Sequence, residues 1–236
     1  MGFEVLSYGQ KETDADFLLL QMTDDHDLEV IEKEVAHIQA LSGGQPFCLK
    51  AVKVNSWNDD LSPWPAPAVF GSEDFGEGAP AALSFLLNEL LPETAESGFR
   101  KTSADKKIFL GGYSLAGLFA LWAGYQTGLF DGIAAASPSI WFPHFTQYMR
   151  ENRMRADAVY LSLGDREEKT RNPIMSQVGN AIREGQASLD KAGVDGILDW
   201  NKGNHFKNPD LRTAKACAWL MNRNSSGSSS VNVEVL

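Results

Sequence analysis

The sequence predicts an α/β fold with a mostly parallel central sheet and helices on both faces. Short apolar runs alternate with longer segments of helical periodicity along nearly the whole chain. Strands separated by helices pair in parallel through right-handed crossovers. The length of 236 residues, with 43% hydrophobic and 22% charged residues, is that of one globular domain. In such a fold, a ligand site is expected at the carboxyl ends of the strands.

Six short segments predict the strands. Each is rich in apolar or β-branched residues and ends in a polar or glycine-containing turn, which is typical of buried strands. They are residues 17–22, 46–54, 106–110, 131–136, 158–164 and 196–203. The first of these, FLLLQM, leads into the acidic turn TDDHD, and the third, KKIFL, runs directly into GGYS.

Five segments predict helices, because their apolar residues recur at helical spacing. They are residues 28–41, 79–91, 115–127, 174–192 and 209–221. Asp27 is expected to cap the first helix and Pro92 to end the second. The Ser-rich residues 223–236 are expected to form a flexible tail. Residues 1–222 are therefore predicted to form one domain, and no separate cap domain is expected.

Composition narrows the choice of partners. The net charge is −10 and the pI about 4.9, whereas nucleic-acid binding requires cations that displace counterions from phosphates. No apolar run is long enough to span a membrane, and the N-terminus lacks the pattern of a signal peptide. The two cysteines have no zinc-site spacing. The sequence favours a cytoplasmic protein with a small-molecule substrate and without a nucleic-acid, membrane or metal partner.

The segment KKIFLGGYSLAGLFALWAGYQ contains the candidate nucleophile. An apolar strand leads into Gly112-Tyr113-Ser114-Leu115-Ala116, and a helix begins at once. A serine in a sharp strand-to-helix turn projects its hydroxyl above the sheet, and the turn needs small residues two positions before and after it. The context predicts Ser114 as the nucleophile of an α/β-hydrolase fold. The alternative is that Ser114 only caps the helix.

The order of residues along the chain selects the candidate base. In this fold the nucleophile comes first, then the acid, then the histidine. Of the four histidines, only His144 and His205 follow Ser114, and only His205 leaves a strand and an acidic loop in between. We therefore predict His205 as the general base, and we expect His144 to line the substrate pocket.

Four segments in this order, GGYSLAGLFALWA, AAASPSIWF, LSLGDREEKT and GNHF, resemble the putative esterase family of α/β hydrolases. That family includes the enterochelin-esterase-like and S-formylglutathione-hydrolase (esterase D) groups. The resemblance runs from about Phe17 to Met221. It implies hydrolysis of an ester or thioester through an acyl-enzyme, without a metal or organic cofactor. It also implies an oxyanion hole formed by the Leu115 N–H and by a second donor in the loop near Thr23 to Asp25, with Thr23 as the candidate.

Three acidic residues compete for the role of the acid that orients the histidine. Asp165, Glu167 and Glu168 all lie in the loop after residues 158–164. Related hydrolases often place the acid a few residues past a glycine, and Gly164-Asp165-Arg166-Glu167 is similar to that arrangement. We therefore predict Glu167. Asp165, Glu168 and a Ser-His dyad without an acid stay open.

Four aromatic residues, Trp57, Trp64, Trp141 and Phe142, are expected to shape the substrate pocket. Ordinary core packing is the alternative for each of them. The prediction for the whole chain is a serine esterase with Ser114, His205 and Glu167. Two other functions stay open, namely an acyltransferase that uses the same residues and a non-catalytic binding protein that keeps the fold.

Overall fold

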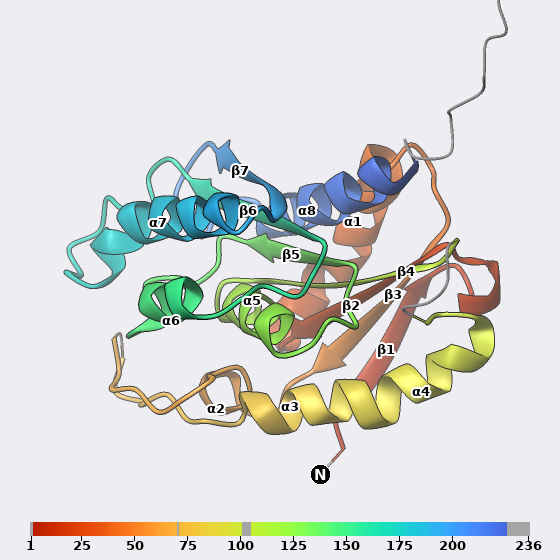
Figure 1. The fold of residues 1–236 in the computed structure, drawn as a ribbon, viewed down its shortest axis with the longest axis horizontal. Helices are drawn as coiled ribbons and strands as arrows, with labels where there is room; N and C mark the ends of the chain where they lie inside the picture. The colour runs from red at the N-terminus through yellow and green to blue at the C-terminus, as the bar shows by residue number, and fades with distance from the viewer. Residues whose placement is uncertain (1, 70, 101–104, 226–236) are drawn as a thin grey trace, which may run out of the picture.

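The structure is a computed structural model that describes residues 2–69, 71–100 and 105–225. A seven-stranded sheet with the strand order β1-β3-β2-β4-β5-β6-β7 lies between two layers of helices (Figure 1). Only β1 is antiparallel to its neighbour. The strands are β1 (Glu4–Gly9), β2 (Phe17–Thr23), β3 (Phe47–Lys53), β4 (Lys107–Tyr113), β5 (Gly132–Ala136), β6 (Ala158–Gly164) and β7 (Asp195–Asn201). The predicted mostly parallel sheet is confirmed.

The helices divide between the two faces of the sheet. They are α1 (Asp25–Leu41), α2 (Trp57–Asp60), α3 (Ala79–Phe85), α4 (Leu91–Thr94), α5 (Leu115–Gln126), α6 (Phe145–Glu151), α7 (Val178–Lys191) and α8 (Pro209–Ser225). α1 and α8 pack against each other on one face. The second face carries α3, α5, α6 and α7. No separate cap domain is found in the ranges that the structure describes.

Each face of the sheet has its own hydrophobic core, and β2 contributes to both. Leu18, Leu20 and Met22 belong to the core under α5, whereas Phe17 and Leu19 belong to the core under α1 and α8. Successive side chains of a strand point to opposite faces. A strand covered on both faces is therefore mostly apolar, which explains the run FLLLQM. Its one polar residue, Gln21, is buried and donates to the Glu34 carboxylate.

The cap of the first helix is one turn earlier than expected. α1 begins at Asp25, and Asp24 rather than Asp27 is its N-cap. The Asp24 carboxylate accepts the Asp27 N–H at 2.8 Å, and the Asp27 carboxylate accepts the Asp24 N–H at 3.3 Å. This reciprocal pair is a capping box with Asp at both positions. The prediction chose the wrong member of the pair.

Pro92 does not end its helix, contrary to the prediction. A π-helical turn at Leu86–Leu90 follows α3, and α4 then restarts with Pro92 in its first turn. A proline is tolerated there because its missing N–H would have no partner in the helix. α8 also runs further than expected, to Ser225, so the first residues of the predicted tail are helical. The rest of that tail, residues 226–236, lies outside the described residues.

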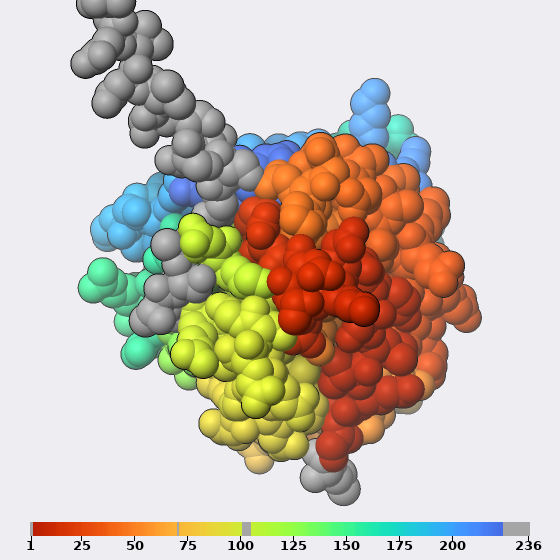
Figure 2. All heavy atoms as spheres, turned by 90° about the vertical axis from the view of Figure 1, so that its right-hand side faces the viewer, coloured from red at the N-terminus to blue at the C-terminus, as the bar shows by residue number. Residues whose placement is uncertain are grey.

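The edge strand β1 was not predicted from the sequence. Its residues are mostly half-exposed or exposed, so it lacks the apolar run that identifies the inner strands. Figure 2 shows this end of the molecule, where the N-terminal segment (red) lies beside the helical region around α4 (yellow to green). Phe3 packs there against Phe85, with ring centroids 5.1 Å apart. No helix in the described ranges combines the length and the apolar character that membrane crossing requires.

Candidate active site

The turn between β4 and α5 holds Ser114 in a strained conformation. Its φ of 57° and ψ of −119° lie in a region that non-glycine residues rarely occupy. A Cβ at Gly112 would lie 2.6 Å from the backbone carbon and the Cβ of Ala116. The turn therefore requires glycine at 112 and a small residue at 116. The predicted strand-turn-helix context of Ser114 is present in the structure.

Ser114, His205 and Glu167 lie in hydrogen-bonding order. The Ser114 Oγ is 3.0 Å from the His205 Nε2, and the His205 Nδ1 is 2.7 Å from the Glu167 Oε2. A carboxylate beside Nδ1 keeps the hydrogen on that nitrogen, which leaves the Nε2 lone pair facing the serine hydroxyl. These three side chains come from the loops after β4, β6 and β7, which end at the same edge of the sheet.

The second carboxylate oxygen of Glu167 is also fully occupied. It accepts hydrogen bonds from the Gly164 N–H at 2.7 Å, the Ser137 hydroxyl at 2.8 Å and the Arg212 guanidinium at 2.7 Å. Burial raises the pKa of Glu167. The hydrogen bond to His205, the charge of His205 and the donors at Gly164 and Ser137 all lower it, and together they have the larger effect. The pKa therefore lies below its usual value, and Glu167 stays ionised.

Arg212 connects Glu167 to the loop that carries His205. Its side chain comes from α8 and is 2% exposed. One guanidinium nitrogen contacts Glu167, and the other donates to the Asn204 carbonyl at 2.9 Å. The Tyr113 hydroxyl donates to the His205 carbonyl at 2.7 Å, and burial raises the pKa of Tyr113 to about 12. Both contacts hold in place the backbone of the loop after β7, which carries His205 and which we call the base loop.

The two alternative acids have other partners. The exposed Asp165 carboxylate accepts the Gly203 N–H at 2.8 Å, and Glu168 lies 3.7 Å from Arg183. The geometry therefore brings Glu167, rather than Asp165 or Glu168, to His205. Asp165 instead ties the loop after β6 to the loop after β7.

Two backbone regions are the predicted oxyanion donors. Leu115 is the first residue of α5, where N–H groups have no acceptor within the helix and the helix dipole is positive. Thr23 ends β2, and the β2–β4 register pairs Gln21 with Gly111, so both strands end at the same level. Thr23 is fully buried, and its hydroxyl has no hydrogen-bond partner. Thr23 as the second oxyanion donor stays a prediction.

Sequence reasoning missed a second serine beside the nucleophile. The Ser139 Oγ is 3.3 Å from the Ser114 Oγ, and the Ser139 N–H donates to the Ser114 carbonyl at 2.9 Å. Ser139 is 3% exposed. Arg212, Ser137 and Tyr113 were missed as well. The signal for both serines was the motif SPS at the end of β5, which carried the resemblance but received no role.

Three of the four predicted pocket aromatics are in ring contact with other aromatic side chains. Trp64 lies 5.9 Å from Phe142 between ring centroids, and its indole N–H donates to the Pro143 carbonyl at 3.0 Å. Phe142 is 2% exposed, whereas Trp57, Trp64 and Trp141 are half-buried. A role of these four residues in substrate binding stays a prediction. His144 lines a cavity of about 380 Å³ together with Trp64, and its place in the substrate pocket stays a prediction.

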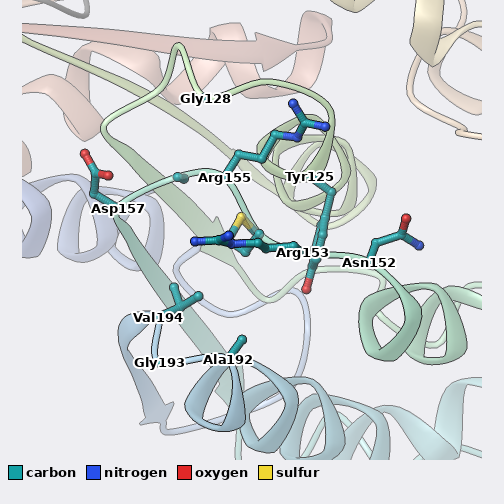
Figure 3. Close-up of a pocket in the computed structure, with 11 residues that line it drawn as sticks. Tyr125, Gly128, Asn152, Arg153, Arg155, Asp157, Ala192, Gly193 and Val194 are labelled. Atoms are coloured by element: carbon teal, nitrogen blue, oxygen red, sulfur yellow. The ribbon is translucent and has the colours of Figure 1, made fainter.

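Another cavity, of about 760 Å³, lies away from Ser114. Its walls include the residues before β6 and before β7, which is the opposite edge of the sheet (Figure 3). Arg153 and Arg155 border it, and the Tyr125 ring forms one side. Within the described ranges, no group of three or more His, Cys, Asp or Glu side chains is placed to hold a metal ion.

Three solved structures share this fold. The IroE-like serine hydrolase from Shewanella oneidensis aligns with a TM-score of 0.72 at 14% identity, over 98% of this chain and 77% of that one. The siderophore hydrolase EstA from Aspergillus nidulans aligns with a TM-score of 0.63 at 17% identity, over 94% of this chain and 95% of that one. The enterobactin esterase FES from Shigella flexneri aligns with a TM-score of 0.63 at 16% identity, over 95% of this chain and 55% of that one. At these identities the likeness shows the fold alone.

The family assignment comes from the sequence itself. A comparison with curated protein sequences gave no match. Residues 50–199, which are more than half of the chain, match the family described as Putative esterase. The matched range includes β4, the Ser114 turn and the loop that carries Glu167. The chain therefore belongs to the Putative esterase family and is an esterase-type enzyme of the α/β-hydrolase fold.

Proposed function

We propose that the protein hydrolyses carboxylic esters or thioesters through an acyl-enzyme, with Ser114 as nucleophile, His205 as general base and Glu167 as the orienting acid. The observation that supports this most is the unbroken series of contacts from Glu167 through His205 to the Ser114 hydroxyl, at 2.7 and 3.0 Å. A helix-capping serine has no need of a histidine partner that is itself paired with a buried carboxylate.

Each step follows from these contacts. His205 Nε2 takes the Ser114 proton as the Oγ attacks the ester carbonyl, and Glu167 stabilises the imidazolium that forms. The Leu115 N–H and a donor near Thr23 stabilise the tetrahedral oxyanion. His205 then gives its proton to the leaving alcohol or thiol. Water, activated by the same histidine, releases the acid from Ser114.

The substrate is proposed only as a class. EstA is a siderophore hydrolase, and the FES structure was determined in the presence of enterobactin. Siderophore esters therefore belong in a substrate panel beside simple aryl esters of increasing chain length. An acyltransferase would show itself in the same assay, because an added alcohol or amine acceptor would divert the acyl group from water.

Replacing the nucleophile tests the proposal. Ser114→Ala should fold, hydrolyse no aryl ester above background and take no fluorophosphonate label, because the probe reacts only with an activated serine. Ser188→Ala is the matched control, since Ser188 is half-exposed on α7, away from Ser114 in the chain, and its hydroxyl donates to the Glu184 carbonyl. Unchanged activity in Ser114→Ala would contradict the proposal. Wild-type protein that neither labels nor hydrolyses would favour a non-catalytic binding protein.

A further inference from the structure

Charge is unevenly distributed along the edge of the sheet that carries Ser114. The loops after β2 and β3 contain acidic residues but no Lys or Arg. These acids are Asp24, Asp59, Asp60, Glu73, Asp74 and Glu77. The loops after β6 and β7 contain five cations against three acids. The cations are Arg166, Lys169, Arg171, Lys202 and Lys207, and the acids are Asp165, Glu167 and Glu168. The strand order places β2 and β3 on one side of β4, and β6 and β7 on the other. The site therefore has an acidic side and a basic side.

The basic side contains a cavity. It measures about 490 Å³ and lies between the loop of Glu167 and the loop of His205. We call it the base-loop cavity, and its lining residues are Asp165, Arg166, Lys202, Gly203, Asn204 and Lys207. Lys207 is two residues from His205, so their backbones lie at most about 7 Å apart. The cavity therefore begins beside the catalytic base.

The cations of this cavity are available to a ligand. Arg166, Lys202 and Lys207 are exposed, and within the described residues no carboxylate lies at ion-pair distance from them. Asp165 is the one acid in the lining, and its carboxylate accepts the Gly203 N–H. That hydrogen bond, with the nearby Arg166, Lys169 and Lys202 charges, holds the pKa of Asp165 below its usual value. Three cations against one anion leave the cavity positive.

The mechanism decides which part of a substrate faces this cavity. His205 must reach the leaving-group oxygen with Nε2 in order to protonate it. The leaving group therefore lies on the His205 side of Ser114, toward the base loop. Resting on the proposed esterase function, we propose that the leaving group of the substrate carries an oxyanion, such as a carboxylate or a phosphate, that binds in the base-loop cavity.

The net charge of −10 does not oppose this. At physiological salt, charges further away than about 8 Å are largely screened. The field at the cavity is therefore set by Arg166, Lys202 and Lys207 rather than by distant carboxylates. Local fields of this kind raise the rate of ligand capture by about 10-fold or more, and the gain falls with salt.

Paired esters that differ only in charge test the proposal. 3-Carboxy-4-nitrophenyl acetate has an anionic leaving group, and its 3-carbamoyl analogue is uncharged but similar in shape. The ratio of their kcat/KM values should be about 10 at low salt and should approach one near 0.5 M NaCl, where the screening length is only about 4 Å. Mono(4-nitrophenyl) adipate, whose charge is on the acyl side, should show no such advantage over 4-nitrophenyl hexanoate.

Charge-removing variants locate the effect. The ratio should fall to about one in Lys202→Gln/Lys207→Gln, since the remaining Arg166 is then balanced by Asp165 and the lining has no net charge. It should persist in Lys11→Gln/Lys191→Gln, which removes the same charge at the opposite edge of the sheet. Two outcomes would overturn the base-loop assignment but not the esterase function. One is a wild-type ratio near one although both esters are hydrolysed, and the other is a ratio that does not change in Lys202→Gln/Lys207→Gln. Hydrolysis of neither ester would overturn the proposed function with it.

Discussion

Glu167 is a carboxylate whose two oxygens have separate tasks. One oxygen faces His205 Nδ1, and the other is held by Arg212, Ser137 and the Gly164 N–H. A Cβ at Gly164 would lie 2.9 Å from this second oxygen and 2.4 Å from the Gly203 carbonyl, so glycine is required there. The glycine in the G-x-x-E pattern thus has a physical reason. It lets the acid fold back against its own strand end.

Replacing the acid is expected to reduce activity far more than replacing its neighbours. Glu167→Gln keeps the size of the side chain but no longer fixes the His205 tautomer, so kcat should fall by up to about 10⁴, as in the serine-protease case. Asp165→Asn and Glu168→Gln should stay within a few-fold of wild type, because neither contacts His205. Steady-state kinetics on one aryl ester would measure all three.

Two other outcomes are informative about the acid. If Asp165→Asn loses activity and Glu167→Gln does not, the assignment moves to Asp165. If all three variants remain within a few-fold of wild type, the enzyme works as a Ser-His dyad. Stability should be measured in parallel, because Glu167→Gln leaves the buried Arg212 without its carboxylate, and losing one partner of a buried pair costs roughly 3–5 kcal/mol.

At the scale of elements, the β4–α5 turn is the most demanding segment of the chain. Its geometry requires close approach at Gly112, and a Cβ at Gly117 would lie 3.0 Å from the Gly112 carbonyl oxygen. The packing of α5 on β4 and β5 therefore depends on residues without side chains. The strain at Ser114 persists because these surrounding contacts hold it.

A single methyl group at the turn should disturb both packing and catalysis. Gly112→Ala places a Cβ 2.6 Å from Ala116, so the turn must shift. We expect a loss of about 1–3 kcal/mol in the free energy of unfolding and a fall in kcat of about 100-fold, the cost of a misplacement near 1 Å. Urea unfolding and ester hydrolysis measure the two effects. Gly2→Ala is the control, since its Cβ would meet open space. Wild-type stability and activity in Gly112→Ala would mean that the turn is not constrained.

At the scale of the whole molecule, the layer between β2, α1 and α8 contains a buried acid outside the site. Glu34 is 4% exposed, and its carboxylate lies 3.4 Å from the Gln21 amide nitrogen. Glu34 Oε1 and Gln21 Oε1 have no hydrogen-bond partner. Burial raises the pKa of Glu34 well above its usual value. The Gln21 hydrogen bond lowers this pKa, and the charges of Asp27 and Asp210 raise it. Lys33 and His37 face Asp210.

This acid should make stability depend on pH. The folded state holds the Glu34 proton more tightly than the unfolded state, so stability falls as pH rises from about 4.5, the ordinary value, toward the raised folded value. Glu34→Gln removes the charge and offers an N–H to Gln21 Oε1. It should add about 1 kcal/mol or more at pH 8 and little at pH 4. Urea unfolding at both pH values measures this, with the exposed Glu32→Gln as control. A destabilised Glu34→Gln at pH 8 would contradict it.

The sequence by itself determined the order of β2 to β7 and of the long helices, and the candidate nucleophile and base. Periodicity and apolar runs are local properties, so the inner strands and long helices followed from them, whereas half-exposed β1 did not. The turn at Ser114 is also local, because its steric needs fall within five residues. The prediction of His205 as the base followed from the order of residues along the chain, because this fold places the nucleophile first, then the acid and then the histidine. The structure brings the Ser114 and His205 side chains together at 3.0 Å.

Only the tertiary structure decided which acid faces His205 and what surrounds it. Asp165, Glu167 and Glu168 lie within four residues of one another, and each has a different partner from a distant part of the chain: Gly203, His205 and Arg183 respectively. Arg212 reaches Glu167 from α8, 45 residues further along the chain. Burial and charge compensation arise from segments that meet only after folding. A sequence pattern records the type of each residue but not the distance between residues far apart in the chain.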